Sequence, residues 1–225
     1  MHTVRVWDLP TRLFHWLLAL SVIGMVITAN VGGNAMPWHF RLGYAIATLL
    51  LFRVVWGFVG GRWSRFGSFI YSPATLLRHL RGQTPASLTT GHSPTGALSV
   101  FALLAVLMAQ VGSGMFSDDD IAFSGPLVSL VSEHTVGLAT KYHKEIGKFI
   151  VIALVVLHLL AIAYYKWVKK TDLVRPMIHG DKALAEPVPP SRDGWGNRLT
   201  ALVVLLLCAV VVNRIIALGA SASLM

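Results

Sequence analysis

Five runs of this chain are almost free of charged residues and long enough to cross a lipid bilayer. A hydrocarbon core of roughly 30 Å needs about 20 residues of α-helix. Backbone N–H and C=O groups find no partners in hydrocarbon, so each run must pair its own groups by forming a helix. The runs are Leu13–Val31, Leu42–Gly61, Thr95–Ser117, Phe149–Tyr165 and Leu199–Gly219. The sequence therefore predicts an all-α integral membrane protein.

Composition agrees with this class and excludes several others. Of the 225 residues, 55% are hydrophobic and only 13% are charged. A single cysteine, Cys208, excludes an internal disulfide framework and a thiolate metal cluster, and no C-x-x-C-H motif is present for covalent haem attachment. The net charge of +9 comes from basic residues that flank the apolar runs. Such residues suit cytoplasmic loops beside anionic lipid, so we expect membrane lipid and not nucleic acid as a partner.

A proline-rich segment before the fifth run divides the chain. Glu186–Ser191 contains three prolines and is predicted to be a stiff linker. We therefore expect a four-helix transmembrane domain over residues 1–178 and a cytoplasmic linker over residues 179–198. An additional C-terminal transmembrane helix is expected over residues 199–225.

The distribution of Lys and Arg predicts the orientation in the membrane, because cytoplasmic loops carry an excess of these residues. With the N-terminus inside, the inner segments hold Arg5, Arg12, Arg62, Arg65, Arg78, Arg81, Lys166, Lys169, Lys170, Arg175, Lys182, Arg192 and Arg198. The outer segments then hold Arg41, Lys141, Lys144, Lys148 and Arg214. We therefore expect a multi-pass protein of the bacterial inner membrane, with a cytoplasmic N-terminus and a periplasmic C-terminus.

Four histidines lie inside or at the edges of the apolar runs: His15, His39, His143 and His158. Histidine is costly to hold in hydrocarbon, so a functional role is the first hypothesis for each. A histidine at a membrane edge, such as His39 or His143, also serves elsewhere as a simple interfacial anchor. The histidines of tails and loops are expected at the solvated surface: His2, His79, His92, His134 and His179. Among these, His134 is the alternative to His143 as a ligand.

Depth in the membrane pairs the four histidines. His15 lies near the inner start of the first helix, and His39 near the outer start of the second. On the fourth helix His143 lies at the outer end, and His158 follows fifteen residues later, about 22 Å deeper. The predicted pairs are His15 with His158 near the inner side, and His39 with His143 near the outer side. Two such pairs match the needs of two bis-histidine b haems, whereas zinc needs three or four close ligands.

Small residues accompany each of the four histidines on its own helix face. They are Ala19 after His15, Gly43 after His39, Gly147 after His143 and Ala161 after His158. A planar macrocycle beside a helix needs small neighbours, although small residues also serve ordinary helix packing. The combination over all four sites favours haem.

Several segments together resemble the prokaryotic cytochrome b561 family, which includes the b-type cytochrome subunit of membrane-bound nickel–iron hydrogenases. They are Val4-Arg5-Val6-Trp7-Asp8-Leu9-Pro10-Thr11-Arg12-Leu13-Phe14-His15-Trp16, Trp38-His39-Phe40-Arg41-Leu42-Gly43-Tyr44, Gly91-His92-Ser93-Pro94-Thr95-Gly96-Ala97-Leu98, His143-Lys144 and Leu157-His158. The similarity extends over residues 4 to about 178. It implies a four-helix core with two haem b groups, whose axial ligands to the haem iron are His15, His39, His143 and His158.

The resemblance also implies a role in electron transfer in a respiratory chain. Electrons would pass between the quinone pool, with quinone as a substrate, and a periplasmic cytochrome c or a dehydrogenase or hydrogenase. The sequence itself does not distinguish these partners, nor a monomer from a homodimer. The protein would supply ligation and orientation, while the haem iron carries the electron.

Haem propionates need cationic partners, and four residues are candidates. Arg12 and Arg53 lie on the inner side, and Arg41 and Lys144 lie on the outer side. Snorkelling to the interface is the alternative for each of them. Arg53 is the strongest candidate, because it lies within an apolar run and needs a partner.

Two other functions remain open at this point. One is oxidation of a small reactive oxygen species at a haem face, with quinone as the acceptor and no protein partner. The other is a membrane anchor for a peripheral oxidoreductase. Turnover by the purified protein alone would favour the first. The sequence shows no nucleophile–base constellation, so hydrolysis and group transfer are not expected.

Overall fold

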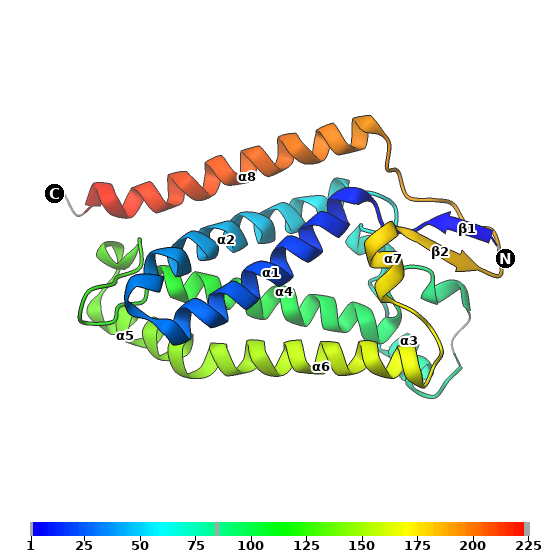
Figure 1. The fold of residues 1–225 in the computed structure, drawn as a ribbon, viewed down its shortest axis with the longest axis horizontal. Coiled ribbons are helices and arrows are strands. Elements are labelled where there is room, and N and C mark those ends of the chain that lie inside the picture. Colours follow the sequence, from blue (N-terminus) through cyan, green and yellow to red (C-terminus); the bar gives the residue numbers. More distant parts are fainter. Residues whose placement is uncertain (1, 84–85, 223–225) are drawn as a thin grey trace. The chain divides into compact units, whose positions relative to one another are not determined.

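A computed structural model describes residues 2–83 and 86–222, and Figure 1 shows its elements. The long helices are α1 (Leu9–Val31), α2 (Met36–Val59), α4 (Pro94–Met115), α6 (Lys148–Trp167) and α8 (Trp195–Ala222). The shorter elements are β1 (His2–Arg5), α3 (Pro73–Leu80), α5 (Glu133–Lys141), α7 (Val174–His179) and β2 (Asp181–Leu184). Short 3-10 turns occupy Gly33–Ala35, Phe66–Ser68, Ala86–Thr89 and Val128–Leu130.

Five helical segments of the described chain are long and apolar enough to cross a membrane, as predicted from the sequence. Large apolar side chains point outward along them, for example Leu20 (64% exposed), Leu157 (61%) and Leu206 (57%). Apolar surface on this scale would be unstable in water and is what lipid tails solvate. The chain is therefore an all-α integral membrane protein.

The fourth membrane-crossing segment is longer than its apolar run. The α5 helix, a π-helical segment over Tyr142–Gly147 and α6 follow one another without a break over Glu133–Trp167. Hydropathy does not reveal that this helical segment begins at Glu133, because many residues of α5 are polar. His143, predicted to lie at a helix end, is therefore inside a continuous helical stretch.

The described chain forms two compact units, each built from parts of the long helices. The first contains Met1–His15, Arg53–Ala102 and Val155–Val204, and the second contains Trp16–Phe52, Leu103–Leu154 and Leu205–Met225. One predicted histidine pair falls within each unit. His15 and His158 belong to the first unit, and His39 and His143 belong to the second.

In the first unit a buried carboxylate fixes the start of α1. Asp8 is fully buried, and its Oδ1 accepts hydrogen bonds from the Thr11 amide (2.8 Å) and Trp56 Nε1 (3.3 Å). Its Oδ2 accepts from the Gly61 amide (3.1 Å) and Ser64 Oγ (2.7 Å). Asp8 thus acts as an N-cap and joins the start of α1 to the end of α2.

Also in the first unit, the N-terminal residues pair with the segment that precedes α8. The β1 and β2 strands form an antiparallel pair, with Arg5 opposite Asp181, and lie side by side in Figure 1. Arg5 forms ion pairs with Asp181 (2.6 Å) and Asp193 (2.5 Å), and Asp193 also binds Arg198 (3.3 Å). The stretch predicted only as a linker therefore contains a strand and anchors the chain's first residues.

In the second unit, a loop after α4 packs against the C-terminal part of α8. Ser129 Oγ donates a hydrogen bond to the Gly219 carbonyl (3.1 Å). A side chain at Gly219 would collide with the Pro126 carbonyl, so glycine permits this close approach. The same loop begins with Asp118 and Asp119, whose surroundings belong to the site described next.

Candidate functional site

The structure brings the four membrane histidines together as two pairs. The ring centroids of His15 and His158 are 6.4 Å apart, and those of His39 and His143 are 6.2 Å apart. These are the pairs expected from depth in the membrane. His134 is exposed on α5 and forms no part of either pair.

The spacing within each pair suits a metal held between two imidazoles. With metal–nitrogen bonds of about 2 Å on both sides, the ring centroids lie about 6 Å apart. Among the described residues, no group of three or more His, Cys, Asp or Glu is placed to hold a metal ion by itself. The donor set in each unit is therefore two imidazoles in apolar surroundings, which fits the axial needs of a b haem.

Hydrogen bonds determine which nitrogen of the His39 and His143 rings is free to bind a metal. His143 Nδ1 lies 2.8 Å from the Gln110 carbonyl, which only accepts, so Nδ1 carries the proton. The Thr28 hydroxyl donates to the Gly24 carbonyl (2.8 Å), so it accepts from His39 Nδ1 at 3.3 Å. Each ring therefore keeps its Nε2 lone pair for a metal, the usual arrangement around ligating histidines.

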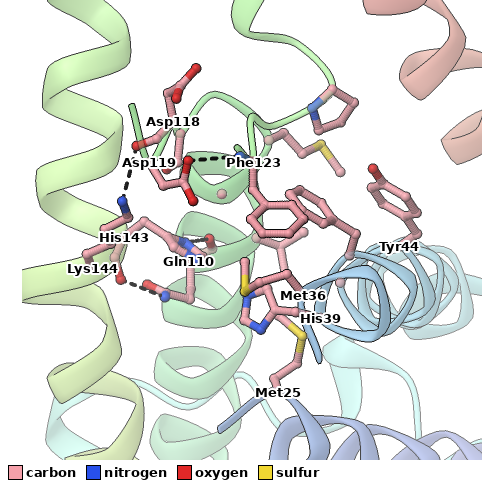
Figure 2. Close-up of a pocket in the computed structure, with 17 residues that line it drawn as sticks. Met25, Met36, His39, Tyr44, Gln110, Asp118, Asp119, Phe123, His143 and Lys144 are labelled. Atoms are coloured by element: carbon pink, nitrogen blue, oxygen red, sulfur yellow. Dashed lines mark hydrogen bonds between the residues drawn. The ribbon is translucent and has the colours of Figure 1, made fainter. Parts of the chain in front are cut away.

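Gln110 and the π-helical segment hold His143 from both sides. Gln110 Nε2 donates a hydrogen bond to the His143 backbone carbonyl (3.0 Å). The Gln110 backbone carbonyl in turn accepts a hydrogen bond from the His143 ring (Figure 2). A π-helical segment replaces the regular α-helical hydrogen bonds, and such segments occur often at functional sites. The reciprocal pair of bonds secures both the backbone and the ring of His143.

Glycines leave room for the outer pair. A Cβ built on Gly114 would lie only 2.7 Å from His143 Cε1, so the ring lies directly against the α4 backbone. Gly43 lines the cavity next to the histidines. Gly147 serves helix packing instead, because a Cβ there would collide with Gln110 Oε1.

A cavity opens between His39 and His143 (Figure 2). Its empty volume, including the open space at its mouth, is about 670 Å³. Apolar side chains form much of the lining: Met25, Met36, Phe40, Val111, Met115 and Phe123. Asp118, Asp119 and Lys144 also line it, and Lys144 Nζ donates to the Asp118 carbonyl (3.2 Å).

Three of the predicted propionate partners have other contacts in the structure. Arg12 Nη1 donates to the Ile178 carbonyl (2.6 Å), and Arg12 Nη2 is 3.9 Å from Asp193. Arg41 is exposed and stacks over Trp38 at 4.8 Å. Lys144 lines the outer cavity as described. Arg53 differs from these, because it is only 2% exposed and lies over the Phe66 ring at 4.8 Å.

His92 corrects one expectation from the sequence. The residue was expected at the solvated surface, but its ring packs against Trp7 (centroids 4.6 Å apart) and Phe69 (4.3 Å). Burial lowers the pKa of His92 to about 3, and the nearby charges of Arg53 and Lys182 add to this effect. The sequence around His92 did not predict that its ring is buried, because the aromatic residues that cover it come from distant parts of the chain.

The helices and the paired imidazoles among them define an all-α membrane protein of the cytochrome b type. Residues 6–180 match the family model described as prokaryotic cytochrome b561, and the chain belongs to that family. It is accordingly a membrane cytochrome of electron transport that uses haem b. Family membership was expected from the sequence and is confirmed.

Three curated relatives carry the description "Probable Ni/Fe-hydrogenase B-type cytochrome subunit". The protein of Bradyrhizobium diazoefficiens is 23% identical over 80% of this chain and 86% of its own length. The protein of Azotobacter chroococcum is 25% identical over 83% of this chain and 91% of its own length. That of Azotobacter vinelandii is 29% identical over 51% of this chain and 60% of its own length. No solved structure gives a significant match.

Proposed function

We propose that this protein carries electrons across the bilayer through two b haems. One haem would be ligated by His15 and His158, and the other by His39 and His143. The observation that carries this proposal is the spacing of the two pairs, 6.4 and 6.2 Å between ring centroids. Two imidazoles at that separation accommodate an iron between them. Without such a ligand, burying four histidine side chains in the hydrocarbon of the membrane would cost free energy with no function to explain it.

When bound, haem b supplies a one-electron couple at its iron. The chain's own contribution is to hold the imidazoles and to set their surroundings. Gln110 and Thr28 keep Nδ1 of His143 and His39 engaged, so Nε2 is presented to the iron. Apolar residues such as Phe40 and Phe123 line the space beside His39 and His143.

We further propose that the quinone pool is one redox partner and that a hydrogenase is the other. The curated relatives are described as Ni/Fe-hydrogenase subunits, which favours this partner over a cytochrome c. The inner bacterial membrane, with the N-terminus in the cytoplasm, is the proposed location. Residues 1–178 would form the di-haem domain, with the linker over 179–198 and the added helix over 199–225.

The first test is the number and type of haems in the purified protein. We expect two low-spin b haems per chain, measured by a pyridine haemochrome assay and by reduced-minus-oxidised spectra. One haem per chain, or a high-spin signal in the intact protein, would contradict the proposal.

Histidine variants then test the pairing. His15→Ala and His158→Ala should remove one spectral component, and His39→Ala and His143→Ala should remove the other. His134→Ala is the matched control, because His134 is exposed on the same helical stretch as His143. Loss of the same component in His15→Ala and His39→Ala would show that the pairs are wrong. Turnover with a reactive oxygen species and quinone, without any partner, would favour the alternative function.

A further inference from the structure

In the first unit, two buried polar nitrogens near His15 have no hydrogen-bond partner among the described residues. They are Arg53 Nη1 and His92 Nδ1. A buried donor or acceptor left unpaired destabilises a structure, and a charged group does so more strongly. Two such atoms in one part of a structure point to a bound group that pairs with them.

The nearest carboxylate does not fill this role for Arg53. Asp8 acts electrostatically on Arg53, yet its two oxygens already accept four hydrogen bonds, from Thr11, Trp56, Gly61 and Ser64. The guanidinium lies over the Phe66 ring instead. Because Arg53 is only 2% exposed, water and lipid headgroups have little access to it.

A second cation increases the positive charge around His92. Lys182 Nζ donates to the carbonyls of Thr89 (2.6 Å) and Thr90 (3.1 Å), which satisfy its hydrogen bonds but not its charge. Arg53, Lys182 and His15 are the charged or titratable groups whose fields act on His92, beside the burial of its ring. This part of the unit thus offers two cations and a neutral imidazole to an anion.

We propose that Arg53 and His92 bind a carboxylate of the cofactor ligated by His15 and His158, namely a haem propionate. The inference rests on the proposed function, since it assigns residues to the inner of the two haem sites. A guanidinium presents a planar fork that matches a carboxylate, and the Nδ1–H tautomer of neutral histidine adds one more donor. Lys182 contributes charge at longer range. Arg53 on α2 and His92 just before α4 would be the residues that hold this propionate.

Redox titration of the purified holoprotein tests the charge of this site. Removing a cation beside a haem favours the oxidised iron, so Arg53→Gln should lower the midpoint potential of the component that His15→Ala removes. We expect at least a tenfold change in the reduction equilibrium, which corresponds to about 59 mV for one electron. The outer component serves as an internal reference and should not move. Arg53→Lys should retain much of the wild-type potential, because it keeps the charge.

The matched controls use residues of the same unit. Arg62→Gln removes an exposed arginine just beyond α2 and should leave both potentials unchanged. His92→Gln should affect the same inner component in the same direction, less strongly, and it provides the readout if Arg53→Gln does not accumulate. A shift of both components, or of neither, in Arg53→Gln and His92→Gln would overturn the proposal.

Infrared difference spectroscopy distinguishes a propionate from any other anion. Cells fed 5-aminolaevulinate labelled with ¹³C at its carboxyl group produce haem labelled in the propionate carboxylates. We expect a labelled carboxylate band to change in the reduced-minus-oxidised spectrum of Arg53→Gln. A change confined to unlabelled bands would show that another anion occupies the site and would overturn the assignment. Wild-type protein without two low-spin haems would overturn the proposed function itself, before any variant is compared.

Discussion

Gly114 and Gly112 lie two residues apart on α4 and have different surroundings. A Cβ at Gly114 would meet His143 Cε1 at 2.7 Å, whereas a Cβ at Gly112 would meet nothing within 4 Å. We therefore expect Gly114→Ala to displace the His143 ring and to weaken or abolish the outer low-spin haem component, measured in reduced-minus-oxidised spectra. The inner component should persist.

Gly112→Ala is the matched control for this prediction. It makes the same chemical change on the same helix and should leave both haem components intact. Since alanine also favours helix over glycine, Gly112→Ala should slightly raise thermal stability. Equal spectra for the two variants would show that His143 does not ligate a haem in the position described.

The pairing of the four membrane histidines could be predicted from the sequence, whereas the residues that form hydrogen bonds with them could not. His158 stands out because it interrupts a run of apolar residues. Gln110 carried a weaker signal, as a polar residue within an apolar span, but its bonds to His143 depend on how α4 packs against the π-helical segment. Asp8 showed only the general character of an N-cap, and its partners at Gly61 and Ser64 lie more than fifty residues away.

At the level of elements, the strand pair and the Asp193 cluster predict a pH dependence of stability. The hydrogen bond from Arg5 lowers the pKa of Asp181. For Asp193, burial opposes ionisation, but the Leu9 amide, Arg198 and Arg5 outweigh it, and the net effect lowers its pKa. Carboxyls with lowered pKa stabilise the fold above their unfolded pKa of about 3.9 and lose this contribution as the pH falls through the folded value.

Melting temperatures of the detergent-solubilised protein between pH 7 and pH 3 check this expectation. The wild type should lose stability below about pH 4, while Asp193→Asn should be less stable at pH 7 and show a flatter curve in that range. Asp120→Asn is the control, since Asp120 is exposed in the outer loop and its positive φ of 59° suits asparagine equally well. Parallel curves for the wild type and Asp193→Asn would contradict the assigned role of the cluster.

Helices and strands differ in how well the sequence predicts them. The five membrane helices follow from uninterrupted hydropathy, which is a local property of the chain. The β1 and β2 strands have only four residues each and pair residues as distant as His2 and Leu184. No local pattern reports such a partner. The π-helical segment was also missed, because hydropathy does not report how the backbone hydrogen bonds of a helix are arranged.

For the whole molecule, the proposed orientation predicts where each terminus is found. In that orientation, which rests on the positive-inside distribution, the N-terminus would lie in the cytoplasm and five spans would bring the C-terminus to the periplasm. An alkaline phosphatase fused after Met225 should be active, and a fluorescent protein that folds only in the cytoplasm should be dark at that position. Fusions within 181–193 should show the reverse pattern. A fluorescent C-terminal fusion with inactive alkaline phosphatase at that position would contradict either the proposed orientation or the fifth membrane span.

The pairing of β1 with β2 has a consequence for the order in which the protein is made. The β1 strand is synthesised before α1, but its partner Asp181–Leu184 follows only after four of the five long helices have been synthesised. Asp193, which binds Arg5 and the Leu9 amide, comes later still. The contacts that hold the start of α1, the helix that carries His15, therefore cannot be completed until Asp193 has been synthesised. On the proposed function, the haem held by His15 and His158 would then be inserted only after these contacts have formed.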